Sequence, residues 1–134
     1  MNIINKYLLE GLNEDKQFVV HIHDARNTNQ HFDLRMMHPN DDKILLSFAF
    51  GKDFDELLDK KIVGARTKDH NIRWLDLKSY RLQEFDKGFF QYLTFSRTYM
   101  LLDFDGEKMK GKYKLFQVKS NKRDDRWLLI KDNK

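Results

Sequence analysis

Apolar and polar residues alternate along most of this chain, in short runs that are typical of β-strands. The segments QFVVHIH and HFDLRMM show the alternation most clearly, and Val, Ile, Phe, Tyr and Leu dominate the runs that follow. Short polar breaks separate the candidate strands 17–23, 31–37, 43–50, 62–69, 72–77, 80–85, 89–95, 98–104, 109–118 and 126–131. So many short strands in one small chain predict a mainly β fold, a small closed or partly open β-barrel with one or two short helices.

Two segments depart from this alternation and space their apolar residues as helices do. Residues 3–13 repeat apolar side chains at helical intervals, so we expect 1–16 to form an N-terminal helical segment. Residues 53–61 begin with Asp53, followed three positions later by Glu56, which is the pattern of a capping box. These are the short helices that we expect beside the barrel.

Length and composition fit one domain. The chain has 134 residues, of which 40% are hydrophobic and 13% aromatic, so we expect a single domain over 1–134 with a buried core. The absence of cysteine excludes disulfides and thiolate metal sites and fits a reducing compartment. No signal-peptide pattern opens the chain, and no apolar run reaches the roughly 18 residues needed to cross a bilayer. We therefore expect a cytoplasmic monomer with no membrane partner.

Two histidine-bearing segments predict a polar site on one face of the sheet. If His23 pairs with His31 across the loop 24–30, the two-residue period sends one polar set to the same face: His21, His23, His31, Asp33 and Arg35. The alternate positions face the other way: Val20, Ile22, Phe32, Leu34 and Met36. Because a one-residue slip would exchange the two sets, we expect this register to be strongly specified.

The polar set contains the side chains of a metal site. Directly opposed residues on paired strands lie about 5 Å apart, so His23, His31 and Asp33 can share one cation. Arg35 stands one position further along, where an anion bound to that cation needs a bidentate donor. His70, in RTKDHNIRWLD, is either a third imidazole of the site or a residue at a surface strand end. Because such a site faces solvent, we expect alanine at any ligand position to remove metal binding with little loss of stability.

Positive charge is concentrated near the C-terminus. The net charge is +4, and residues 108–134 hold ten Lys/Arg against three Asp, a balance of +7 that leaves −3 for the rest. Lys108, Lys110, Lys112 and Lys114 occupy every second position, which on a strand aligns four ammonium groups on one face. This lysine stripe either follows a phosphate backbone or protects an edge strand from pairing with another chain.

Three stretches of the chain resemble the motifs of one protein family. The stretch FVVHIHDARNTNQHFDLRM resembles a signature that runs FVV-x-x-H-D/H-A, a short loop and H-Y-D-F/L-R-L. The second, ILLSFAFGKDFDELLDKKIVGARTKDH, is similar to a run of S-W-A, a Gly-Pro turn, a D-K-R-L-A-V segment and E-D-H-P. The third, KMKGKYKLFQV followed by DRWLLIK, is similar to L-K-G-x-W/F-x-L-x-R and W-L-L-I-K. The family that these motifs resemble is the 3′-phosphoesterase domain of bacterial and archaeal DNA ligase D, and the likeness covers 18–76 and 108–131.

The resemblance implies a hydrolase of DNA repair, a manganese-dependent phosphoesterase that removes a 3′-phosphate or a terminal ribonucleotide and leaves a 3′-OH. Carried over by position, His23, His31 and Asp33 would hold Mn²⁺ or another divalent transition metal. Arg35 and His70 would contact the phosphate, and His31, Arg35 and His70 would be the catalytic residues. The implied partners are DNA or RNA–DNA 3′ ends, touched by the lysine stripe, and a DNA ligase or polymerase supplied as a separate chain.

The chain departs from the family's pattern around this site. His21 stands where the family often has Gln, Trp74 stands where it has a functional Tyr, and the Gly-rich G-x-Y-G turn is missing. Tryptophan has one N–H donor and can neither ionise nor accept a hydrogen bond, so a phenolic role would be lost. We expect Asp24 and Trp74 to lie just behind the metal ligands, and His21 either to lie there as well or to join the site itself.

These departures leave two other functions open. The first is a DNA-end-binding module of the same fold with weakened or absent catalysis. The second is a non-haem iron oxygenase, in which His31, Asp33 and His70 would form a 2-His-1-carboxylate triad. Release of phosphate from a 3′-phosphorylated primer separates the enzyme from the module, and decarboxylation of 2-oxoglutarate would identify the oxygenase.

Overall fold

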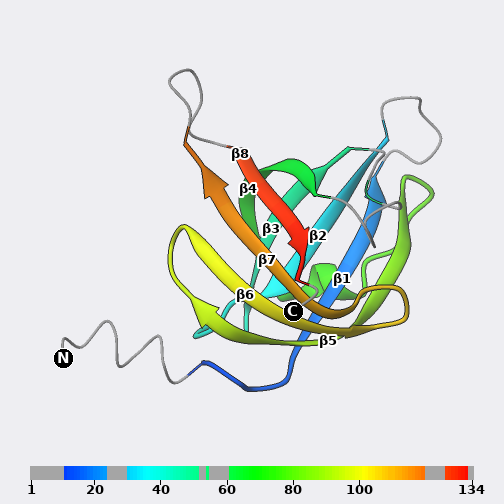
Figure 1. Cartoon of the computed structure of the whole chain (residues 1–134). Helices are drawn as coiled ribbons and strands as arrows, with labels where there is room; N and C mark the ends of the chain where they lie inside the picture. The colour runs from blue at the N-terminus through cyan, green and yellow to red at the C-terminus, as the bar shows by residue number, and fades with distance from the viewer. Residues whose placement is uncertain (1–10, 24–29, 52–53, 55–60, 120–125, 133–134) are drawn as a thin grey trace.

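A computed structural model describes residues 11–23, 30–51, 54, 61–119 and 126–132, and eight strands lie within them. They are β1 (Lys16–His23), β2 (His31–Met37), β3 (Ile44–Phe50), β4 (Ile62–Asn71), β5 (Leu82–Phe95), β6 (Tyr99–Gly106), β7 (Lys110–Val118) and β8 (Arg126–Lys131). The strands close into a barrel in the order β1-β2-β3-β4-β8-β7-β6-β5, and each neighbouring pair is antiparallel (Figure 1). The predicted mainly β fold is confirmed, and its barrel is closed.

The interior of the barrel is filled by the apolar member of each alternating pair. Phe18 and Val20 of β1, Phe48 of β3, Phe104 of β6 and Leu129 of β8 belong to one core cluster, and each is at most 2% exposed. The rings of Phe18 and Phe104 meet edge to face at 4.9 Å. Burying each such side chain contributes about 1.5–3 kcal/mol. Residues that alternate with this set therefore lie on the outer face of the wall.

The predicted strand 72–77 is wrong, because residues Ile72–Leu75 form a 3-10 helix, η2. The side chain of Asn71 caps this helix by accepting a hydrogen bond from the backbone N–H of Arg73 at 2.9 Å. Leu75 is 5% exposed and packs against Val19 and Leu45, which face outward from the barrel wall. The alternating apolar residues of this segment thus cover the outside of the barrel and take no place in the sheet.

The predicted strands 80–85 and 89–95 are one continuous strand, β5. The polar break between them contains Asp86, which is 2% exposed, and its carboxylate accepts hydrogen bonds from the backbone N–H groups of Lys87, Glu107, Lys108 and Met109 at 2.7–3.2 Å. The buried carboxylate of Asp86 therefore has its hydrogen-bond partners in the middle of β5. Two residues after Asp86, the backbone of Gly88 lies so close to β6 that an added Cβ would be 2.4 Å from the carbonyl oxygen of Asp105. This close approach explains the glycine at that position.

The predicted helices fall mostly outside the described residues, which omit 1–10, 52–53 and 55–60. Of the first predicted helical segment, 1–16, only residues 11–16 are described. Residues 11–13 form a turn in which Asn13 has a φ of 61°, and Lys16 already begins β1. The helical segment predicted for 1–16 is therefore wrong over its described part. No helix in the described part of the chain is long and apolar enough to cross a membrane.

We predict that Asp86→Ala lowers the free energy of unfolding by about 3 kcal/mol, because four backbone N–H groups, the buried one of Met109 among them, lose their acceptor at once. Urea unfolding followed by circular dichroism measures this loss. Asp105→Ala is the matched control, since that carboxylate is exposed and pairs with Lys110 at 3.8 Å, so its loss is expected to stay below about 0.5 kcal/mol. Equal losses in the two variants would contradict the structural role of Asp86.

Candidate metal centre

The pairing of β1 with β2 gathers the predicted polar set on the outer face of the barrel. The register pairs His23 with His31, His21 with Asp33 and Val19 with Arg35, so the sequence-based pairing is confirmed. The alternate positions Val20, Phe32, Leu34 and Met36 belong to the main core cluster. The polar side chains therefore start from neighbouring points of the same wall.

Three of these side chains form a group with the geometry of a metal site. One ligand atom from each of His23, His31 and Asp33 lies within 4.8 Å of the others. The carboxylate of Asp33 faces both rings, with Oδ2 at 3.3 Å from Nδ1 of His23 and Oδ1 at 3.4 Å from Nε2 of His31. The imidazole side chains are 39% and 36% exposed, whereas the Asp33 side chain is 6% exposed. This arrangement offers a cation two nitrogens and an oxygen on a side open to solvent.

Arg35 lies directly behind Asp33 and is buried. Its side chain is 3% exposed, and Nη2 donates to Oδ2 of Asp33 at 3.1 Å. Nε donates to Nδ1 of His21 at 3.3 Å, and Nη1 donates to Oγ of Ser47 at 3.2 Å. Each guanidinium nitrogen thus has an acceptor inside the protein, which fixes the position of the Asp33 carboxylate.

His21 is a neutral member of this network. The residue is 1% exposed, and burial, followed by the charge of Arg35, lowers the pKa of His21 to about 4, although a hydrogen bond to the backbone of Leu77 opposes the shift. Its Nδ1 accepts from Arg35, so the other ring nitrogen carries the proton. His21 therefore joins the guanidinium to the segment that follows η2, in agreement with its predicted place behind the ligands.

His70 contacts Arg35 at Nη1, the nitrogen that also donates to Ser47, whereas Asp33 accepts from Nη2. Nδ1 of His70 is 3.0 Å from Oγ of Ser47 and 3.3 Å from Nη1 of Arg35. Burial, and after it the charge of Arg35, lowers the pKa of His70. The structure thus groups His23, and not His70, with His31 and Asp33.

Ser47 is the residue that sequence reasoning missed. It is 0% exposed and contacts both Arg35 and His70, so it holds two of the predicted residues together. The feature of the sequence that could have identified Ser47 is its hydroxyl, the one polar side chain in the strand ILLSFAF. Ser47 pairs with Arg35 across β2 and β3.

Trp74 of η2 covers this network from outside. The Arg35 guanidinium carbon lies 4.7 Å from the centroid of the indole, and the His70 ring meets the indole edge to face at 4.6 Å. Trp74 thus contacts the neighbours of the candidate ligands, and its predicted place behind the ligands stays a prediction. Asp24, the third residue predicted there, lies outside the described residues.

The lysine stripe lies on another part of the barrel. Lys110, Lys112 and Lys114 occupy the outer face of β7, because the residues between them include the buried Tyr113. Lys108 precedes the strand and its Nζ donates to the backbone oxygen of Phe85 at 2.6 Å, so three of the four lysines form the stripe on β7. The strand pairs on both sides, with β6 and β8, which excludes the edge-strand explanation.

The stripe faces away from the group of His23, His31 and Asp33, which we call the metal group. In the closed strand order, β7 is four strands from β2 by either route, so their outer faces point in opposite directions. Asp103 and Asp105 of β6 lie directly across from Lys112 and Lys110, and their carboxylates offset part of the positive charge. A nucleic-acid end at the metal group therefore needs basic residues that lie nearer to it.

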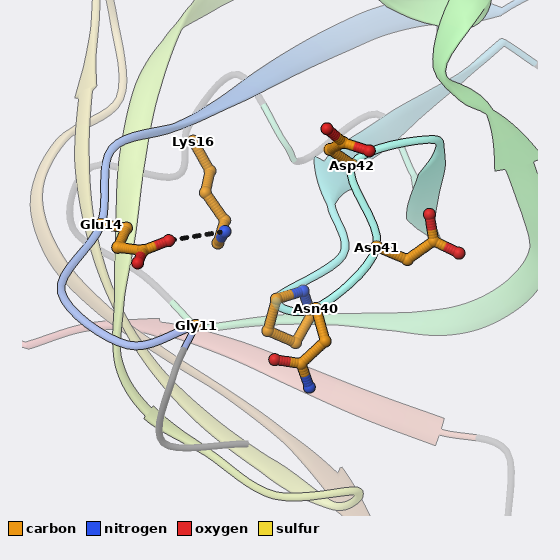
Figure 2. A pocket seen from close by; sticks show the side chains of 7 residues that line it. Gly11, Glu14, Lys16, Asn40, Asp41 and Asp42 are labelled. Carbon is orange, nitrogen blue, oxygen red and sulfur yellow. Dashed lines mark ion pairs between the residues drawn. The ribbon is translucent and has the colours of Figure 1, made fainter. Parts of the chain in front are cut away.

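A hollow of about 430 Å³ lies at the opposite end of β1 from the metal group. Figure 2 shows Glu14 and Lys16 reaching toward each other, with Nζ and Oε2 3.6 Å apart, beside Asp41 and Asp42. Lys16 begins β1 and His23 ends it, a separation of about 23 Å at 3.3 Å per residue. None of the predicted site residues lines this hollow.

No protein-family model matches this chain, and no curated protein matches it. The relation to the ligase D phosphoesterase domain therefore stays a prediction, based on the motif HIHDARNTNQHFDLR. What the structure adds is the position of the motif's described side chains, those of residues 21–23 and 30–35.

We predict that the free energy of unfolding falls as the pH drops from about 6.5 to about 4, by up to about 3 kcal/mol from His21. In this window the unfolded chain binds a proton at His21 that the folded chain excludes, so the folded state is favoured above the window and loses stability below it. Urea unfolding at about pH 7.5 and about pH 4.5 measures the effect.

His21→Gln is the control for this prediction, because Gln can accept from Arg35 and cannot titrate. The variant should lose clearly less stability between the two pH values than the wild-type protein. The same pH dependence in both proteins would show that the ring of His21 is not held neutral by the fold.

Proposed function

We propose that this protein is a metal-dependent phosphoesterase that acts on the 3′ ends of DNA. The observation that carries the proposal is the group of His23, His31 and Asp33, whose ligand atoms meet on the outer wall of the barrel. The resemblance of the surrounding motif to the ligase D phosphoesterase domain supplies the substrate class and suggests Mn²⁺ as the cofactor.

The donor set fits such an ion. Two imidazoles and one carboxylate suit a divalent transition metal and would leave it coordination positions for substrate or water. A bound ion would polarise a phosphoryl oxygen and lower the pKa of a bound water. Because the imidazole side chains are more than a third exposed, a phosphate reaches the group from solvent.

The residues behind the group hold it in place. Arg35 fixes the carboxylate of Asp33 and is fixed in turn by His21 and Ser47. We assign this positioning role to Arg35, while its predicted direct contact with phosphate remains an expectation from the resemblance. His70 is adjacent to Arg35 and partly accessible, and it is the residue we expect to bind the phosphate or protonate the leaving oxygen.

We predict that the protein releases phosphate from a primer ending in 3′-phosphate when Mn²⁺ is present and not when the metal is chelated. His31→Ala should lower the affinity for Mn²⁺ by more than about 100-fold and abolish release, because it removes a ligand. Titration calorimetry measures the metal, and a phosphate assay measures turnover. His38→Ala is the matched control, since His38 lies outside the group and its Nδ1 accepts from the backbone N–H of Asn40 at 3.0 Å.

Other results would point to other functions. Binding of the primer without release in the wild-type protein would overturn the enzyme and favour a non-catalytic DNA-end-binding module. Two imidazoles and a carboxylate are also the ligands of non-haem iron oxygenases, so decarboxylation of 2-oxoglutarate with Fe²⁺ is the contrasting assay. Its success, with no phosphate release, would replace the proposal.

We also predict that the ligand positions differ in their effect on stability, in contrast to the equal tolerance expected from sequence. Asp33→Ala should cost about 3–5 kcal/mol of unfolding free energy, because it leaves the charge of Arg35 buried without its partner. His23→Ala should cost less than about 1 kcal/mol, since its ring is partly exposed. Urea unfolding of metal-free protein measures both, and equal small losses would contradict the buried ion pair.

A further inference from the structure

Two aromatic side chains are more than half exposed in the described part of the chain, and their charged surroundings differ. Phe89 is 51% exposed and lines a hollow of about 250 Å³ together with Asp15, Asp103 and Asp105. Tyr80 is 63% exposed, follows Lys78 by two positions and has the Arg81 guanidinium carbon 5.4 Å from its ring centroid. Carboxylates repel a phosphate backbone and basic side chains attract it, so of the two rings Tyr80 suits nucleic acid.

The position of Tyr80 in the fold places it beside the metal group. Tyr80 and Arg81 form the tip of a tight turn closed by two backbone hydrogen bonds between Ser79 and Leu82, at 3.1 and 3.3 Å. Leu82 begins β5 and pairs directly with His23 of β1. Paired residues are about 5 Å apart and each residue adds about 3.3 Å, so the backbone of Tyr80 lies roughly 10 Å from that of His23.

Hydrogen bonds connect this turn to the residues behind the metal group. The hydroxyl of Ser79 accepts from the backbone N–H of Arg81 at 3.3 Å, which orders the tip of the turn. Just before the turn, the backbone of Leu77 forms a hydrogen bond with the ring of His21, which in turn accepts from Arg35. The turn that carries Tyr80 is therefore connected, through Leu77 and His21, to the residues behind the metal group.

We propose that the Tyr80–Arg81 turn binds the terminal nucleotide of the DNA strand whose 3′ end reaches the metal group. Tyr80 stacks on the base, and Lys78 and Arg81 bind the backbone phosphates. This inference rests on the proposed function, because the metal group fixes where the 3′ end lies. Stacking uses the face of the base and not its edge, so the site accepts any of the four bases.

The experiment measures binding of a fluorescein-labelled single-stranded 3′-OH oligonucleotide, the product of the proposed reaction, by anisotropy in the presence of Mn²⁺. Tyr80→Ala should weaken binding about 5- to 150-fold, the range for loss of one stacked base, while Tyr80→Phe keeps the ring and the affinity. Phe89→Ala, the matched removal of an exposed ring, should change affinity by less than about twofold.

A second oligonucleotide, abasic at its 3′-terminal nucleotide, identifies the stacked base. The wild-type protein should bind it as weakly as Tyr80→Ala binds the normal strand, and the abasic change should have no further effect on that variant. Equal losses from Tyr80→Ala and Phe89→Ala, a base effect independent of Tyr80, or no binding by the wild-type protein would overturn the inference.

The result separates this inference from the proposed function, because binding of the product needs no turnover. Binding that depends on Tyr80, without phosphate release from a 3′-phosphorylated strand, would support the stacking site and contradict the proposed enzyme activity. Phosphate release, together with binding that is unchanged in Tyr80→Ala, would support the proposed enzyme activity and contradict the stacking site.

Discussion

The buried ion pair between Arg35 and Asp33 is the interaction on which the candidate site depends. Both residues are at most 5% exposed, and either charge left alone at that depth would cost several kcal/mol. The pair forms because the β1–β2 register turns Asp33 and Arg35 to the outer wall and because η2 then covers that wall with Trp74. Held in this way, the carboxylate presents one oxygen to each imidazole, so the metal geometry follows from the ion pair.

The part of this arrangement that follows from alternation could be predicted from sequence. With His23 taken to pair with His31, the two-residue period assigned the polar and apolar sets to opposite faces, since a slip would bury charges in the core, and the observed register agrees. The period could not separate a strand from η2, because Ile72 and Trp74 also alternate with polar residues while packing on the outside of the barrel. Nor could the period show that the buried carboxylate of Asp86 accepts hydrogen bonds from the turn between β6 and β7. The sequence therefore predicts two strands where the structure has one.

The charges on the outer surface of the barrel are distributed unevenly, which bears on how the proposed DNA substrate would approach. The lysines of β7 stand opposite carboxylates of β6 and face away from the metal group. The basic residues nearest to His23 along the β1–β5 pairing belong to the turn that carries Tyr80, which is also the most exposed of the large hydrophobic side chains in the described residues. The proposed catalytic site and the proposed strand-binding turn are thus connected through the short segment between η2 and β5.

The central claim is that His23, His31 and Asp33 bind one metal ion, and anomalous diffraction from crystals soaked in Mn²⁺ tests it most directly. The account predicts one peak within about 2.0–2.3 Å of a nitrogen from each histidine and an oxygen of Asp33. A peak only elsewhere, such as among the carboxylates Glu14, Asp41 and Asp42 at the other end of β1, would contradict it. So would the absence of any peak at a Mn²⁺ concentration that saturates binding in solution.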